Sequence, residues 1–421
     1  MPNWLFEFIN PWTTPLAIVA AITFVAWVCQ VRGRWLATVA LSAAVGIALW
    51  QAWKAGPPNG LLDLQIYTNS ARAWVNGGSI YDYFDPTFHL SATYPPIGPL
   101  LFTSLTPLTA DGREVLFTAV NLLALFGCAW FVAGLARVDA AKRFTWSAWA
   151  FAAATVTIPV WLTLRQGQIN ILIWLLVLVD LDAMRRSSRW AGFGIGLATA
   201  IKLVPGLFIV WLAATNRWWS TLRAIGALAL ATAIGWALAP SDSKRYWTDL
   251  IWHSDRVGSV SDARNNSALG MIARIIDPGV PRTSIWLVLV SATLAIALVR
   301  SVRASRANDY LAVAAIVGCA TAALSPISWT HHLGFLLVAL VAFVVQATTF
   351  KAKALCAIAW LILVDPAGHG DEPWLSTVRA LMVIGAVCCT PIRSPEIAKQ
   401  LDDNQTETTP SNLETNSALP S

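Results

Sequence analysis

The segment 61–100, LLDLQIYTNSARAWVNGGSIYDYFDPTFHLSATYPPIGPL, carries the residues whose types are best suited to chemistry. It is rich in aromatic, Asn, Asp and Gly residues, and its first carboxylate, Asp63, follows an apolar run that ends near Trp53. An ionised carboxylate in that place can face both water and a membrane-embedded substrate, and it can accept a proton from a hydroxyl. Capping of the amphipathic stretch 64–75 is the structural alternative, because Asp is a favoured residue at a helix N-terminus.

A second group of polar residues, Arg165, Gln168 and Asn170, lies in the sequence RQGQIN between two apolar runs. Amide side chains donate and accept hydrogen bonds and Arg binds phosphate, so this group suits a hydroxyl-rich or anionic ligand. A plain turn between two helices, with Gly at its corner, explains the segment equally well.

Lys202 interrupts the apolar sequence GFGIGLATAIKLVPGLFIVW, with Pro205 close behind it. A cation at bilayer depth costs roughly 3 kcal/mol, so ionisable residues there are functional candidates by default. A lysine beside a broken helix can hold a lipid phosphate. The alternative is a structural lysine whose long side chain extends to the membrane surface.

Two further motifs raise the question of a metal. The segment 325–332, SPISWTHH, ends in His331 and His332. Adjacent histidines on a helix point about 100° apart, so we expect one of them to orient a phosphate or sugar. The DLD sequence at 180–182 has the outline of a metal site, but the arginines at 185–186 explain it better by ion pairing. No metal or other cofactor is therefore expected.

The composition identifies the class of protein that must position these residues. Hydrophobic residues make up 56% of the 421 residues, charged residues only 12%, and the mean hydropathy is +0.58. An average soluble domain has roughly 25% charged residues. Apolar runs of about 17–25 residues, the length that crosses hydrocarbon, recur along the chain. The sequence therefore predicts an all-α polytopic membrane protein, with membrane lipids as its surroundings.

Basic clusters predict the orientation of the spans, because cytoplasmic loops are enriched in Lys and Arg. The clusters lie at 32–34, 185–189, 217–223, 300–306 and 351–353. The first outer loop is then 54–96 and the second large outer loop is 240–283. The net charge of +6 reflects these basic helix ends, so it argues for topology and against nucleic-acid binding.

We expect roughly 11–14 membrane helices, a cytoplasmic C-terminus and an N-terminus on either side. The candidate spans are 15–31, 35–53, 97–109, 115–136, 145–163, 169–184, 190–202, 203–215, 222–239, 284–300, 308–324, 332–349, 354–364 and 374–391.

Two segments do not fit the rule that successive loops lie on alternate sides of the membrane. We expect 191–215 to form two short helices that meet at Lys202, since irregular backbone at depth is tolerated where it lines a cavity. We expect 97–114 to be a short re-entrant hairpin. The membrane domain then covers residues 1–394, and the polar segment 395–421 is predicted to be a disordered cytoplasmic tail because it has almost no large apolar residues.

Taken in order, these motifs resemble glycosyltransferase family 87, whose members are multi-spanning enzymes of the GT-C fold that use polyprenyl-phosphate sugars. The resemblance rests on the Asp63 loop with NGGSIYD and TYPPIGPL, on GQIN (167–170), on GLATAIKLVPGLFIVWL followed by RWW, on RNNSALG (264–270), and on SPISWTHH (325–332). It covers roughly residues 55–350. Within the family, the chain is most similar to actinobacterial α-1,2-mannosyltransferases of phosphatidylinositol mannosides, lipomannan and lipoarabinomannan.

The resemblance implies a role for each candidate residue. Asp63 is the expected catalytic base, which deprotonates an acceptor hydroxyl that attacks a β-linked polyprenyl-phosphate mannose with inversion. Residues expected to bind the donor phosphate or sugar are Lys202, Arg165, Gln168, Asn170, His331 and His332. Residues that could contact the mannolipid acceptor are Trp74, Tyr81, Tyr94 and Asn266. The site is expected on the extracytoplasmic face of the cell membrane.

Two other functions fit the same sequence. An arabinofuranosyltransferase of the same family would use the same phosphate-lipid donor chemistry with a different sugar. A transporter or flippase of a lipid-linked sugar would use Lys202 and Asp63 as charges along its pathway. Transporters commonly contain inverted repeats, and the sequence contains no detectable internal repeat, which disfavours that function.

Overall fold

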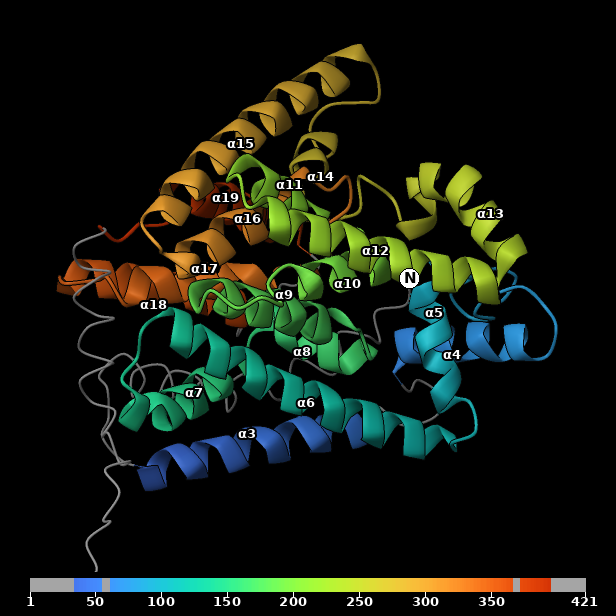
Figure 1. Ribbon diagram of the computed structural model, residues 1–421, viewed down its shortest axis with the longest axis horizontal. Helices are drawn as coiled ribbons and strands as arrows, with labels where there is room; N and C mark the ends of the chain where they lie inside the picture. Colours follow the sequence, from blue (N-terminus) through green and yellow to red (C-terminus); the bar gives the residue numbers. More distant parts are fainter. Residues whose placement is uncertain (1–33, 55–60, 366–371, 395–421) are drawn as a thin grey trace, which may run out of the picture.

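The computed structural model describes residues 34–54, 61–365 and 372–394. Within these ranges the chain is helical and has no β-strand, as the sequence predicts. The longest helices are α3 (Arg34–Lys54), α6 (Ala110–Leu135), α12 (Trp218–Leu238) and α15 (Val280–Arg306). Helices α3 and α15 lie along opposite margins of the molecule, with the others between them (Figure 1). The predicted span 15–31 and the predicted tail 395–421 fall outside the described residues.

Shorter helices fill the space between the long ones. In chain order they are α4 (Leu62–Val75), α5 (Ile97–Leu101), η1 (Phe102–Leu105), α7 (Ala140–Thr155), α8 (Ile158–Gln166), α9 (Asn170–Arg185), α10 (Phe193–Ile201), α11 (Gly206–Ala214), α13 (Pro240–Thr248), η2 (Leu250–Trp252), η3 (Ser254–Val257), α14 (Ala268–Ala273), α16 (Tyr310–Leu324), η4 (Thr330–His332), α17 (Gly334–Val344), α18 (Phe350–Val364) and α19 (Pro373–Cys389).

In the described ranges three helices, α6, α12 and α15, are long and apolar enough to cross a membrane. Helices α7 and α8 pass the same test as a pair, but they bend by 74° at the break between them. The predicted span 145–163 is therefore a broken one, not a straight helix. The other apolar helices offer described apolar stretches of only 10–17 residues, so the number of 11–14 crossings stays a prediction.

Helix α16 forms the centre of the bundle. It packs against α15, α17 and α19, and its residues from Tyr310 to Ala320 are all buried. Many of them are Ala or Gly, which let helices approach closely in an apolar bundle. A side chain at Gly318 would overlap Phe335 of α17, because its Cβ would lie 2.1 Å from the ring.

The predicted break at Lys202 is confirmed. Helix α10 ends at Ile201, Lys202 has extended backbone angles, and α11 begins at Gly206. Helix α10 is held against α12 by Gly192 and Gly196, where an added Cβ would lie 2.1 Å from the carbonyl oxygens of Ser220 and Ala224 respectively. This close approach fixes where α10 ends, and hence where Lys202 lies.

The predicted re-entrant hairpin is also consistent with the structure. Helix α5 has 5 residues and η1 has 4, which is far too short to cross a bilayer at 1.5 Å per residue. Helices α4, α5 and α13 gather at one side of the molecule (Figure 1). The 54–96 and 240–283 segments therefore supply neighbouring elements, as two outer loops should.

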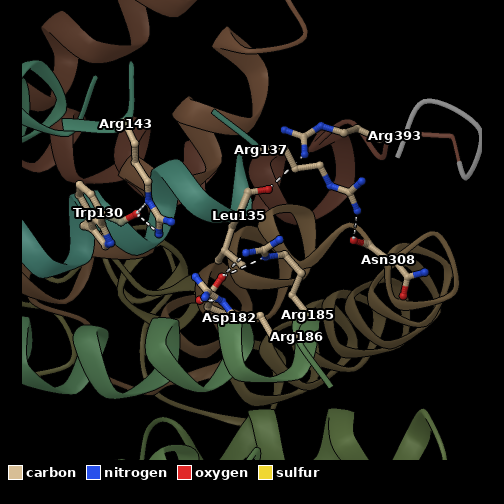
Figure 2. Close-up of polar contacts among 9 residues, drawn as sticks. All are labelled: Trp130, Leu135, Arg137, Arg143, Asp182, Arg185, Arg186, Asn308 and Arg393. Atoms are coloured by element: carbon tan, nitrogen blue, oxygen red, sulfur yellow. Dashed lines mark hydrogen bonds and ion pairs between the residues drawn. The ribbon is translucent and has the colours of Figure 1, made fainter. Parts of the chain in front are cut away.

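An arginine-rich network lies at the C-terminal ends of α6 and α9 (Figure 2). Asp182 at the end of α9 pairs with Arg185 and Arg186 at 3.0 and 2.7 Å. Arg393 donates to the backbone oxygen of Leu135 at 3.2 Å, so the segment after α19 is tied to the end of α6. The ion pairing predicted for the DLD sequence is confirmed. The other aspartate of that sequence, Asp180, accepts from the backbone N–H groups that start α10.

The close contact between α10 and α12 generates a test with a matched control. Gly196→Ala should lower the stability of the protein by about 1–3 kcal/mol, because the new methyl group overlaps a backbone carbonyl and forces the helices apart. Gly226→Ala, on α12, meets nothing within 4 Å and should be neutral or stabilising by about 0.5–1 kcal/mol. Thermal unfolding of both variants in detergent measures the difference. Equal melting temperatures would contradict the described packing.

Candidate active site

Asp63 lies in the first turn of α4. The helix begins at Leu62 and its N-cap residue is Leu61, so Asp63 is not the cap that its sequence position allows. A carboxylate in the first turn is favoured by the positive end of the helix dipole. Its side chain accepts a hydrogen bond from Gln168, whose Nε2 lies 2.7 Å from Asp63 Oδ2. The carboxylate is thus held by a residue more than a hundred positions away.

The turn between α8 and α9 brings Gln168 to this place. Gly167 ends α8 with a φ of 68°, a left-handed conformation that favours glycine. A Cβ there would lie 2.8 and 2.7 Å from the Cβ atoms of Leu61 and Leu64. The turn therefore touches the start of α4, and only a glycine allows that contact. This explains why the sequence RQGQIN lies beside Asp63.

Two tyrosines fix the orientation of the Gln168 amide. The hydroxyl of Tyr94 donates to Gln168 Oε1 at 2.8 Å, and the hydroxyl of Tyr67 lies 3.1 Å from the same atom. The two hydroxyls are also within 2.8 Å of each other. Because hydroxyl donors occupy the amide oxygen, the NH₂ group must face Asp63.

Lys202 continues this chain of contacts. Its Nζ donates to the hydroxyl of Tyr94 at 3.2 Å and to Asn170 Oδ1 at 2.8 Å, and it lies 3.1 Å from His332 Nε2. An ammonium away from water is costly unless such partners surround it. A continuous polar path therefore links the base candidate Asp63 to the cation candidate Lys202 through Gln168 and Tyr94.

The two histidines differ in their surroundings. His332 contacts Lys202 through Nε2, and its Nδ1 accepts from the backbone N–H of Trp329 at 3.2 Å. The backbone oxygen of His331 accepts from Asn170 Nδ2 at 2.9 Å, while its ring nitrogen Nε2 has no partner among the described residues. The two rings meet edge to face, with their centres 4.6 Å apart.

A cavity of about 570 Å³ lies over this chain. Its volume falls in the range of about 300–1,000 Å³ typical of ligand pockets. The polar residues of its lining include Asp63, Tyr67, Tyr94, Gln166, Gln168, Lys202, Arg256, Asp262, Arg264, Thr330, His331 and His332. Apolar side chains such as Trp161 and Leu203 complete the wall. The cavity can therefore enclose a ligand with both polar and apolar parts.

Burial raises the pKa of Asp63 from 3.8 to about 6. The hydrogen bond from Gln168 and the charge of Lys202 both lower it, and they only partly offset the loss of water. Asp63 belongs to the predicted outer loop, outside the spanning helices. A carboxylate with a pKa near 6 is ionised at neutral pH and is a better proton acceptor than an ordinary aspartate.

Several of the predicted site residues lie outside the cavity lining. Tyr81 is buried against Tyr246, with a ring distance of 5.8 Å, and Trp74 packs on the same small cluster. Asn266 is buried behind the wall, where its Nδ2 donates to the backbone oxygen of Ser328. Arg165 and Asn170 do not line the cavity either, although Asn170 holds Lys202. Direct substrate contact by these five residues stays a sequence-based prediction.

The structure adds lining residues that the sequence analysis did not select. Tyr67 lies four residues after Asp63 in α4, so helical spacing alone points it to the same face. Arg256 comes from η3, and Asp262 and Arg264 come from the irregular segment after it, all within the predicted second outer loop. No periodic pattern marks those three, and only the folded chain brings them to the cavity.

Comparisons with known proteins agree with this architecture. The model of glycosyltransferase family 87 matches residues 92–328, more than half of the chain. The matched segment includes Tyr94, Gln168 and Lys202, but it begins after Asp63 and ends before His331. No solved structure matches the chain significantly.

Three mycobacterial proteins are similar to the chain over most of its length. A polyprenol-phosphate-mannose-dependent α-(1-2)-phosphatidylinositol mannoside mannosyltransferase of Mycobacterium tuberculosis is 30% identical over 309 residues, covering 69% of this chain and 71% of that protein. A protein of the same name from Mycolicibacterium smegmatis is 29% identical over 354 residues, 77% and 78% of the two chains. A phosphatidylinositol pentamannoside mannosyltransferase of M. smegmatis is 29% identical over 298 residues, 68% and 71%. The chain therefore belongs to glycosyltransferase family 87, a family of membrane glycosyltransferases.

Proposed function

We propose that the chain transfers mannose from polyprenyl-phosphate mannose to a phosphatidylinositol mannoside, forming an α-1,2 linkage with inversion. The names of the similar mycobacterial proteins support the donor and the acceptor class. The single observation that carries the mechanism is that a carboxylate and a lysine, Asp63 and Lys202, line one cavity and are joined by a fixed polar path.

Asp63 is the proposed catalytic base. It takes the proton of an acceptor hydroxyl as the hydroxyl oxygen forms a bond to the anomeric carbon of the donor mannose. The bond from that carbon to the phosphate oxygen breaks, and polyprenyl phosphate leaves with the electron pair. Attack from the face opposite the phosphate converts the β-linked donor into an α-linked product. Gln168, which holds one carboxylate oxygen, is a positioning residue for this step.

Lys202 is proposed to contact the donor phosphate and to stabilise the charge that grows on it as the bond breaks. Preorganised cations in a cavity that excludes water stabilise such charge strongly. Asn170 Oδ1 accepts from the ammonium and holds it in place, which makes Asn170 a positioning residue. His332 Nε2 lies 3.1 Å from the same Nζ. His331, with an unpartnered ring nitrogen in the cavity wall, is proposed to bind the donor phosphate or sugar.

The site is proposed to face the extracytoplasmic side of the cell membrane. Helix α9 supports this placement, because Asn170 begins it at the site and the arginines at 185–186 lie at its other end. At 1.5 Å per residue the two ends are separated by roughly 22 Å. Basic residues favour the cytoplasmic side, so the site lies at the opposite surface.

Purified protein should transfer label from radioactive polyprenyl-phosphate mannose to a phosphatidylinositol mannoside. A polyprenyl-phosphate arabinofuranose donor in excess should compete poorly, since the similar proteins use mannose. Thin-layer chromatography of the lipid products measures both results. Label transferred only from the arabinose donor would favour the arabinofuranosyltransferase. Movement of the lipid-linked donor across the vesicle membrane, without transfer of mannose to the acceptor, would favour the transporter.

Asp63→Asn should lower the rate of transfer by about 10²–10⁴-fold, the usual contribution of a general base, because the amide cannot accept the proton. Asp82→Asn is a matched control, since Asp82 is in the same outer loop and its side chain is 64% exposed. The control should keep wild-type activity. Substantial activity in a purified, folded Asp63→Asn protein would remove Asp63 from the role of base.

The rate should fall as the pH drops below about 6, because Asp63 must be ionised to act and burial raises its pKa to that value. Lys202→Met should move this acid limb to higher pH, since the lysine charge favours the ionised carboxylate. It should also raise the KM of the donor by removing a phosphate contact. Lys244→Met, at an exposed lysine of α13, should change neither quantity. If the rate of Lys202→Met fell over the same pH range as that of the wild type, the proposed effect of the Lys202 charge on the pKa of Asp63 would be contradicted.

A further inference from the structure

The cavity lining has a second polar group, here called the second wall, whose members are not part of the Asp63–Lys202 chain of hydrogen bonds. This wall consists of Asp262 and Arg264 from the second outer loop and Trp329 from the segment before η4. The two segments are tied together behind the wall by Asn266, whose Nδ2 donates to the backbone oxygens of Arg264 and Ser328 at 2.7 and 3.2 Å. The wall is therefore a built feature of two distant segments.

Asp262 and Arg264 form a two-pronged ion pair. Arg264 Nε donates to Oδ1 at 2.9 Å and Nη2 donates to Oδ2 at 2.8 Å. Their side chains keep 21% and 27% of their surfaces exposed, so the pair presents polar edges to the cavity. Burial acts to raise the pKa of Asp262, but the hydrogen bonds from Arg264 hold it below the ordinary value. The carboxylate and the guanidinium are therefore both charged, and their two charges cancel within the pair.

The indole of Trp329 completes this wall. The Arg264 guanidinium lies 5.6 Å from its ring centre. Gly258, with a φ of 140°, approaches the ring so closely that a Cβ would lie 2.5 Å from Cζ2. The ring is thus held by its neighbours and is only partly buried. It offers a flat apolar surface beside a neutral pair of hydrogen-bonding groups.

The two polar groups of the lining suit different ligand chemistries. Lys202 supplies a net positive charge, which favours a phosphate. The Asp262–Arg264 pair supplies donors and acceptors without net charge, and a flat ring lies beside it. A sugar has that combination, since its hydroxyls hydrogen-bond and its C–H groups form an apolar face. In the donor, the transferred sugar is bonded directly to the phosphate and must therefore lie between Lys202 and Asp63.

We propose that Asp262, Arg264 and Trp329 form the subsite for a mannose residue of the acceptor glycolipid. This assignment rests on the proposed function and deepens it, because it separates the residues that contact the acceptor from those that contact the donor. Trp329 stacks on one face of the sugar, and the ion pair binds hydroxyls at its edge. The acceptor then enters from the side of the second outer loop and presents its free hydroxyl to Asp63.

Two variants test the subsite in full-length protein reconstituted in lipid nanodiscs. Trp329→Ala removes the ring but keeps the backbone N–H that contacts His332, and Asp262→Asn keeps the shape but removes the charge. Each should raise the KM of a phosphatidylinositol mannoside acceptor by about tenfold, the factor for one lost contact of about 1.4 kcal/mol. The KM of the donor should not change.

Two substitutions in the same loop serve as matched controls. Trp252 is 76% exposed, and Asp249 is 54% exposed and pairs with His253, also exposed. Neither residue lines the cavity. Trp252→Ala and Asp249→Asn should leave both KM values at the wild-type level. A rise in the donor KM of Trp329→Ala or Asp262→Asn, or unchanged acceptor KM values, would overturn the assignment.

A binding measurement separates failure of the subsite from failure of the proposed function. Octyl α-mannoside is the probe, and saturation-transfer NMR detects its contact with the protein in nanodiscs. Wild-type protein should bind it, and Trp329→Ala should lose at least tenfold in affinity. If the wild type transfers no mannose but shows this pattern of binding, the proposed function fails and the sugar subsite stands. Absence of binding to the wild type would overturn the subsite.

Discussion

The structure depends on the need to hold one ammonium group inside an apolar helical bundle. Lys202 is only 9% exposed, and Tyr94, Asn170 and His332 surround its charge. Together with Lys202 these partners come from four separate parts of the chain, so the start of α9, the end of α10, the segment before α5 and η4 must all meet at the same point. A buried charge without such partners is strongly unfavourable, which makes this convergence a condition of folding as well as of function.

A network of hydrogen bonds extends from this ammonium to a carboxylate. Tyr94 accepts from Lys202 and donates to Gln168, and Gln168 donates to Asp63. Each member has its donor and acceptor roles fixed by the next, because a tyrosine hydroxyl has one proton and an amide has distinct oxygen and nitrogen ends. The carboxylate and the cation are therefore set in relation to each other before any substrate binds. Such preorganisation lowers the cost of stabilising charge during a reaction.

Close helix contacts allow the network to form. Gly196 lets α10 lie against α12, and Gly167 lets the turn after α8 touch the start of α4. At the far ends of the helices, Asp182 pairs with the two arginines that end its own helix, α9, and Arg393 joins the chain after α19 to α6 (Figure 2). The cavity is thus formed by short, broken helices at one surface and supported by long helices and ion pairs at the other.

The sequence by itself determined the helical class and the break at Lys202, because composition and an interrupted apolar run are local signals. It left Asp63 open between helix cap and base, and only the family resemblance favoured the base. Only the tertiary structure decided that Asp63 is no helix cap and that Gln168 and Tyr94 join it to Lys202. It also placed Trp74, Tyr81 and Asn266 behind the cavity wall and Asp262 and Arg264 in it. Whether a polar side chain faces a cavity or a neighbouring helix depends on contacts between distant segments, which residue spacing does not encode.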